Sequence, residues 1–251
     1  MNVMAYLLND CLLRVGTEVC RIVEVEYYSD PDPFIHGASE QKTAHCWYFH
    51  KANPSTPGPT GFRSGTFKGL DFTIGSAIHS ASILIRSIEV DGNIIEGPCK
   101  VVNYILQVTQ CSSIEHLVGL SSSYPPSALD VTFPLHIEGT VLEPREIFHG
   151  PRVGLTLKHE LFPDGPRTQY VMKPYRCTTV PSKLSKYKCL LALHYLTNHN
   201  FDQTTNIFGK SVSRWSYSAI QGHSSVSLNL ETVSGLCQAY GYLSSRGFTS
   251  G

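Results

Sequence analysis

The alternation of apolar and polar side chains is clearest over residues 21–28, Arg-Ile-Val-Glu-Val-Glu-Tyr-Tyr, and predicts a β-strand. Successive side chains point to opposite faces, so one face would carry Val23, Val25 and Tyr27, and the other Ile22, Glu24, Glu26 and Tyr28. We expect the valine face to lie against the core. The carboxylate face has two interpretations: the solvated side of an antiparallel sheet, or a pocket wall where a carboxylate acts and the tyrosine stacks on a ligand.

Hydrophobic periodicity and turn residues predict the other elements of the chain. Helices are expected over residues 4–14, 98–107, 186–199 and 229–243, and strands over residues 69–74, 81–90, 131–142, 152–158 and 168–177. Polar or proline-rich segments predict loops over residues 29–45, 51–66 and 120–129. The elements indicate an α+β fold: a single domain on a curved, mostly antiparallel sheet with flanking helices over residues 1–183, then a helical C-terminal extension over residues 184–251.

Composition adds limits on the class of protein. Apolar residues make up 41% of the 251 residues and charged residues 16%, which favours a folded chain over a disordered one. No run approaches the roughly 20 apolar residues that a membrane helix needs, and the start lacks the features of a signal peptide, so we expect an intracellular protein of the nucleus or cytoplasm without a membrane partner. The eight cysteines are scattered, which is typical of reduced, buried thiols.

Motifs for metals and nucleotide cofactors are absent from the sequence. The histidines show no H-x3-H or H-E-x-x-H spacing, and neither phosphate-binding glycine motif occurs, so we expect no metal and no cofactor. The net charge is zero, but residues 1–100 hold eight Lys or Arg against eleven Asp or Glu. Proteins that bind duplex DNA usually carry a basic face, so this acidic balance argues against duplex binding by that part of the chain.

A series of short motifs resembles one protein family. Residues 21–28, followed by Asp32-Pro33 and His36, resemble the R-I-V-E-T-E-A-Y…D-P…H signature of the 3-methyladenine (alkyladenine) DNA glycosylase family. Five further segments resemble family landmarks in the family's order: residues 69–75, 83–89, 97–100, 152–155 and 173–176. The resemblance covers about residues 5–180, and so many moderately specific motifs in one order are hard to obtain by chance.

The resemblance implies roles for four residues. The family's water-activating glutamate falls on Glu26, and the arginine that would hold this carboxylate by charge-assisted hydrogen bonds falls on Arg86. The aromatic side chain that stacks on a flipped base falls on Tyr28. The contact to the edge of the base falls on His36, which follows Tyr28 by eight residues, one fewer than in the family. A register slip of two residues would exchange Glu26 for Glu24.

The sequence departs from the family at the residues that open duplex DNA. Lys68 stands where the family has a wedge tyrosine, and Phe67 is the nearest aromatic residue to a missing partner in the base sandwich. Gly75 replaces the asparagine that shapes selectivity against guanine. Phe67, Lys68 and Gly75 are therefore candidates for a wedge or a pocket rim, and the sandwiching ring could instead come from Trp47-Tyr48-Phe49.

Three hypotheses follow from the resemblance. The first is a monofunctional DNA N-glycosylase of base excision repair, a hydrolase that flips an alkylated or deaminated purine and cleaves its N-glycosidic bond with a Glu26-activated water. The second is an N-glycosidase on a free nucleoside or nucleotide. The third is a non-catalytic base- or nucleic-acid-binding module of the same fold, whose C-terminal helices contact a protein partner. A Glu26 side chain in packed core would argue against both enzymatic hypotheses.

Overall fold

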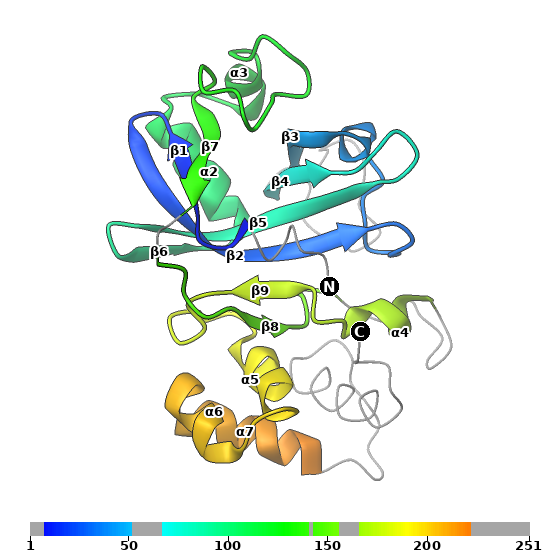
Figure 1. Ribbon diagram of the computed structural model, residues 1–251, viewed down its shortest axis with the longest axis vertical. Coiled ribbons are helices and arrows are strands. Elements are labelled where there is room, and N and C mark those ends of the chain that lie inside the picture. Colours follow the sequence, from blue (N-terminus) through cyan, green and yellow to red (C-terminus); the bar gives the residue numbers. More distant parts are fainter. Residues whose placement is uncertain (1–7, 52–66, 141–142, 156–165, 222–251) are drawn as a thin grey trace. The chain divides into compact units, whose positions relative to one another are not determined.

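The computed structural model describes residues 8–51, 67–140, 143–155 and 166–221 (Figure 1). These residues belong to two compact units. The N-terminal unit comprises Asn2–Asp30 and Ile35–Arg145, and the C-terminal unit comprises Pro31–Phe34 and Glu146–Gly251. The expected boundary between residues 183 and 184 falls inside the C-terminal unit and stays a prediction. No helix among the described residues is long and apolar enough to cross a membrane.

An antiparallel sheet forms the centre of the N-terminal unit. Its strands are β1 (Cys11–Val15), β2 (Glu18–Ser29), β3 (Ala44–Lys51), β4 (Lys68–Ile74), β5 (Ala81–Val90), β6 (Asn93–Glu96) and β7 (Leu135–Thr140). The spatial order is β3-β4-β5-β2-β1-β7, and β6 pairs with the end of β5. Every one of these pairings is antiparallel. The expected fold class, α+β on a curved antiparallel sheet with flanking helices, is confirmed (Figure 1).

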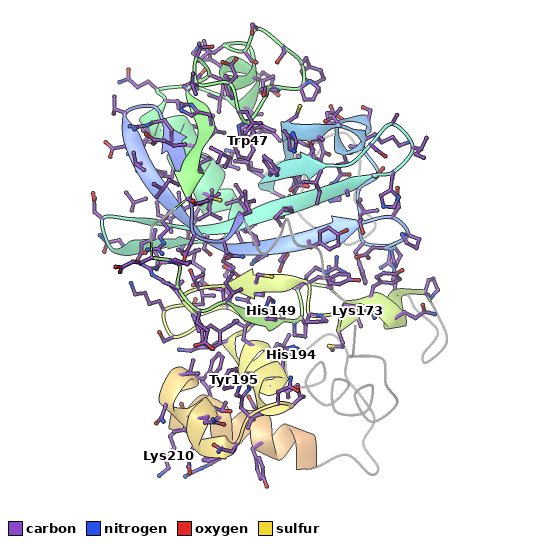
Figure 2. All side chains as sticks on the ribbon, in the orientation of Figure 1. Trp47, His149, Lys173, His194, Tyr195 and Lys210 are labelled. Atoms are coloured by element: carbon purple, nitrogen blue, oxygen red, sulfur yellow. The ribbon has the colours of Figure 1, made fainter. Side chains whose placement is uncertain are left out.

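Among its described residues, the N-terminal unit also contains three short helical segments: η1 (Ser39–Lys42), α2 (Pro98–Val108) and α3 (Ile114–Val118). Helix α2 begins after Gly97, whose positive φ of 109° suits a glycine, and proline occupies its first turn as expected. Its apolar side is buried against β4 and β5 through Val101, Val102, Ile105 and Leu106. One face of the sheet therefore lies on an apolar core, where Trp47 (labelled in Figure 2) packs edge-on against Phe72 and donates to the Leu135 carbonyl at 2.8 Å.

The C-terminal unit joins a two-stranded ladder to helices. Strands β8 (Phe148–Gly150) and β9 (Arg176–Thr178) pair antiparallel, α4 (Pro166–Val171) lies between them in sequence, and α5 (Lys188–Leu196), α6 (Phe201–Phe208) and α7 (Lys210–Gln221) follow. The expected helical extension is thus present over these three helices. Helix α5 buries Leu190, Leu191, Ala192 and Leu193, and the Phe148 ring of β8 lies 5.6 Å from the ring of Tyr195.

Several expected elements were wrong or lie outside the described residues. Residues 11–15 form strand β1 where a helix over 4–14 was expected, because Cys11, Leu13 and Val15 alternate with less buried neighbours and pair with β2 and β7. Residues 151–155 form no strand, and the ladder strand β8 precedes them. Residues 166–171 form helix α4, not a strand, with Pro166 at the start. The helix expected over residues 229–243 lies outside the described residues.

Two histidines and a cysteine meet in the C-terminal unit, where Figure 2 labels His149 and His194. His149 of β8 lies opposite Cys177 of β9, with 3.3 Å between its Nδ1 and the thiol sulfur. Burial raises the pKa of Cys177 to about 12, so this thiol is not a ready nucleophile. Burial, followed by the charge of His149, lowers the pKa of His194 to about 4.

The lowered pKa of His194 predicts acid sensitivity. Between its usual value of 6.5 and about 4, the unfolded chain binds a proton that the folded chain excludes, so stability falls as the pH falls through this window. From about pH 7 to about pH 4.5, the wild type should lose about 2 kcal/mol more free energy of unfolding than His194→Gln. Urea unfolding followed by circular dichroism measures both. Equal losses in the two proteins would contradict this assignment.

Candidate functional site

Strand β2 carries Glu24, Glu26 and Tyr28 on the face opposite the apolar core, as the alternation predicts. The pairing with β5 contains two irregularities: Ile22 lies opposite Ile88 but Glu24 opposite Ser87, and Val25 then lies opposite Ile85. Each strand thus holds one extra residue, Val23 on β2 and Arg86 on β5. The two irregularities compensate, so the register is the same on either side of them. Arg86 lies two residues from Leu84, which pairs with Glu26, and ordinary alternation places its side chain on the face of the β2 carboxylates.

Arg86 forms ion pairs with two carboxylates inside the protein. Its Nε donates to Glu24 Oε1 at 3.2 Å, and its Nη1 donates to Glu26 Oε2 at 3.4 Å. The other oxygen of Glu24 accepts a short hydrogen bond from the Ser87 hydroxyl. Glu24 and Glu26 are each 0% exposed and Arg86 is 5% exposed. The carboxylate face is therefore not solvated, which removes the first of the two interpretations of this face. The complete burial of Glu26 also counts against the two enzymatic hypotheses, by the criterion stated above.

The charges of this cluster depend on one another. Burial acts to lower the pKa of Arg86, but the negative charges of Glu26 and Glu24 and the neighbouring Tyr28 outweigh it and raise that pKa above its usual value. The guanidinium therefore stays charged. Buried ions are costly unless they are paired and hydrogen-bonded, so Arg86 is the counter-charge that allows two glutamates to lie inside the sheet.

Tyr28 lies beside Glu26 on the same face. Its hydroxyl donates to Glu26 Oε2 at 2.9 Å, and its side chain is half-buried. One oxygen of Glu26 thus receives hydrogen bonds from both Arg86 and Tyr28. The structure brings together three of the residues that the sequence indicated, and Glu26 Oε2 is the atom they share.

A second polar cluster lies on the same face of the sheet, around Asp71 of β4. Asp71 pairs in register with Leu84 of β5, which pairs in register with Glu26 of β2, so Asp71 and Glu26 share a face. The Oδ2 atom of Asp71 accepts from the Ser82 hydroxyl at 2.7 Å and from Gln41 Nε2 at 3.3 Å.

The partner of this carboxylate on β3 is His50. Its Nε2 lies 3.1 Å from Asp71 Oδ1, and both side chains are buried. The rings of Tyr48 and Phe67 lie 5.6 and 5.3 Å from the His50 ring. His36 packs edge-on against it at 4.7 Å. Partial burial, followed by the charge of His50, lowers the pKa of His36, whereas Asp71 acts to raise it.

The remaining candidate residues lie at different places in the structure. His36, Phe67 and Tyr48 lie around the His50 ring. Lys68 lies in phase with the core-facing residues of β4, and its Nζ donates to Asn103 of α2 at 2.8 Å, away from the carboxylate face. Gly75 packs beneath η1, where an added Cβ would lie 1.9 Å from the Gln41 carbonyl oxygen. The space there explains the glycine as a packing requirement.

Sequence reasoning missed His50 and Asp71. The signal was the polar phase of β4, in which Gly69, Asp71 and Thr73 alternate with large apolar residues, as Glu24 and Glu26 do on β2. Among the described residues, no group of three or more His, Cys, Asp or Glu is placed to hold a metal ion.

Comparison with known proteins gives one informative relative. The chain is 32% identical over 204 residues to "Uncharacterized protein L759" of Acanthamoeba polyphaga mimivirus, a match that covers 74% of this chain and 88% of the viral protein. The chain belongs to the L759 family. No family model matches it. Because the match covers most of both L759 and this chain, the shared sequence is too long to be confined to one polar cluster or one helix.

The Arg86 cluster predicts an unusual cost of substitution in this L759-family chain. Arg86→Met should lower the free energy of unfolding by about 3–5 kcal/mol, because two buried carboxylates lose their counter-charge. Arg14→Met is a matched control, since Arg14 pairs with Glu138 at a more exposed place on the same sheet, and it should cost less than about 1 kcal/mol. Urea unfolding measures both.

A double variant separates charge from packing. Arg86→Met with Glu26→Gln should be more stable than Arg86→Met alone, because one uncompensated charge is removed. Equal costs for Arg86→Met and Arg14→Met, or no recovery in the double variant, would contradict the role given to Arg86.

Proposed function

We propose that the chain hydrolyses the N-glycosidic bond of a purine nucleoside, free or as an unpaired nucleotide of DNA, with Glu26 activating the water. The observation that carries this proposal is the convergence of Arg86 and Tyr28 on Glu26 Oε2, at 3.4 and 2.9 Å, on the polar face of the sheet. The resemblance to the alkyladenine DNA glycosylase motifs supports the same assignment, since Glu26 and Arg86 are the residues on which its chemistry would fall.

The reaction needs what this cluster offers. As the C1′–N bond lengthens, positive charge develops on the sugar, and a carboxylate nearby stabilises it. The same carboxylate takes a proton from the attacking water. Arg86 would hold the carboxylate in place, and Tyr28 would offer its ring to the base, a contact worth about 1–3 kcal/mol per base.

Two observations favour a nucleoside or unpaired nucleotide over a base in intact duplex DNA. Residues 1–100 have an acidic excess, which weakens attraction to phosphates. Lys68, at the position of the family's wedge tyrosine, bonds to Asn103 on the α2 side of the sheet. An unpaired nucleotide needs no wedge, because extrusion from a stack costs least where pairing is already absent.

One observation favours a second candidate, a base-binding module without catalysis. Glu26 is 0% exposed, so water and substrate reach its carboxylate only if the surrounding side chains move. A binding protein needs no such access to Glu26, and the buried ion pairs would then serve to hold Tyr28 and its neighbours in place.

Base release tests the proposal. Wild type should release hypoxanthine from free inosine or from single-stranded oligonucleotides that contain it. Glu26→Gln should lower the rate by at least about 100-fold, because it keeps the shape and removes the charge. Glu24→Gln is the matched control, because Glu24 lies on the same strand and pairs with the same arginine. It should retain more than roughly a tenth of the rate if the chemistry belongs to Glu26.

The outcomes divide the candidates. A larger loss in Glu24→Gln than in Glu26→Gln would transfer the chemistry to Glu24. No release by wild type from free, single-stranded or duplex substrates would overturn hydrolysis. Binding of hypoxanthine by that inactive protein would then support the second candidate. Release from duplex with strongly salt-sensitive binding would restore the duplex-DNA substrate.

A further inference from the structure

The imidazole of His50 is buried with one of its two nitrogens used. It is 8% exposed, and its Nε2 lies 3.1 Å from Asp71 Oδ1. Within the part of the chain that the structure describes, its Nδ1 is buried and has no hydrogen-bond partner. A buried polar atom without a partner costs about 1–3 kcal/mol, so packing alone is a poor reason for a histidine here.

Asp71 determines which nitrogen of His50 is left over. The carboxylate is itself held by Ser82 and Gln41, so it is a fixed acceptor. It therefore orients the ring with Nε2–H donating to Oδ1 and leaves Nδ1 as the atom available to another group. A histidine that a carboxylate orients in this way presents its other nitrogen to a ligand and can exchange a proton there.

The backbone of β4 makes room for the ring at Gly69, which pairs with His50 in register. A Cβ on Gly69 would lie 2.2 Å from both Cε1 and Nε2 of the imidazole, closer than real atoms approach. The rings of Tyr48 and Phe67 are inclined to it by only 30° and 32°. The imidazole is thus flanked by tilted and edge-on aromatic rings, surroundings that suit a flat heteroaromatic base.

The His50–Asp71 pair and Glu26 are separated by about the length of a nucleoside. Asp71, Leu84 and Glu26 are in register on three neighbouring strands. Two strand spacings separate the ends of this row, about 10 Å between backbones. Side chains from both ends share one face, and a nucleoside that displaced the side chains covering them would present its sugar to Glu26 and its base to His50.

We propose that His50, oriented by Asp71, hydrogen-bonds the purine through Nδ1 and protonates it as the glycosidic bond breaks. This inference rests on the proposed function and adds the general acid that protonates the leaving base. The C1′–N bond breaks and its electron pair goes to the base nitrogen, which takes the proton from His50 Nδ1. Water adds its oxygen to C1′ and gives a proton to Glu26. Solvent then returns one proton to His50 and removes one from Glu26.

The choice of leaving group tests this role. Hypoxanthine needs a proton to leave inosine, whereas the cationic base of 7-methylguanosine leaves as a neutral molecule without one. His50→Gln should lower inosine hydrolysis by about 100-fold and 7-methylguanosine hydrolysis by less than about threefold. Asp71→Asn should show the same selectivity, and so should Gly69→Ala, which displaces the ring. His79→Gln, an exposed histidine near the start of β5, should change neither rate.

Equal losses on both nucleosides, or no loss on either, would overturn the role of His50 as acid. Failure of the proposed function is a different result, in which wild type hydrolyses neither nucleoside. Calorimetric binding of free hypoxanthine then decides the base contact. At least about tenfold weaker binding by His50→Gln, with His79→Gln unchanged, would support the contact. Unchanged binding by His50→Gln, or no binding by wild type, would overturn it.

Discussion

A guanidinium buried between two carboxylates is the interaction on which the polar face of the sheet depends. Neither Glu24 nor Glu26 could lie inside the protein alone, because an isolated buried carboxylate loses more hydration energy than packing returns. Arg86 supplies the counter-charge, and the alternation of β5, in which Leu84 lies opposite Glu26, places it on that face. The ion pairs therefore depend on the pairing of β2 with β5, which keeps one register on both sides of its two irregularities.

The buried ion pairs also fix the register of strand β2. A shift of β2 by one residue would place the carboxylates in the apolar core and the valines opposite Arg86, which no other part of the face could compensate. The apolar face also favours this strand arrangement. There the indole nitrogen of Trp47 donates to the carbonyl of Leu135 on the far edge strand β7. Apolar packing and a charged cluster thus select the same arrangement from opposite faces.

The sequence predicted the elements whose patterns are long and regular. Strands β2, β4 and β5 and helix α2 were expected close to their actual bounds, because alternation and a Gly-Pro start are local signals. The first strand was mistaken for a helix because Leu12 and Leu13 satisfy both periods, and only pairing with β2 and β7 chooses between them. Helix α4 was mistaken for a strand because Tyr170 and Val171 have strand propensity, while Pro166 begins a helical turn.

The candidate site likewise contains residues that the sequence predicted and residues that it did not. Glu26 and Tyr28 could be placed together because they belong to one predicted strand, and Arg86 was added from a second motif of the resemblance, residues 83–89. That both faces of β2 would be buried could not be inferred, since alternation reports two faces but not what covers each. His50 and Asp71 belong to different strands and meet across a residue without a side chain, so no local pattern joins them.

Gly69 has an evolutionary consequence. The imidazole of His50 occupies the volume that a side chain at position 69 would fill, so the two positions behave as a single unit of sequence. A lineage that keeps the histidine must keep the glycine. A lineage that replaces the histidine with a small residue frees position 69 to become alanine, valine or threonine, the ordinary occupants of a strand. Divergent members of the L759 family should therefore fall into two groups at this pair, and the identity of position 69 alone should sort them.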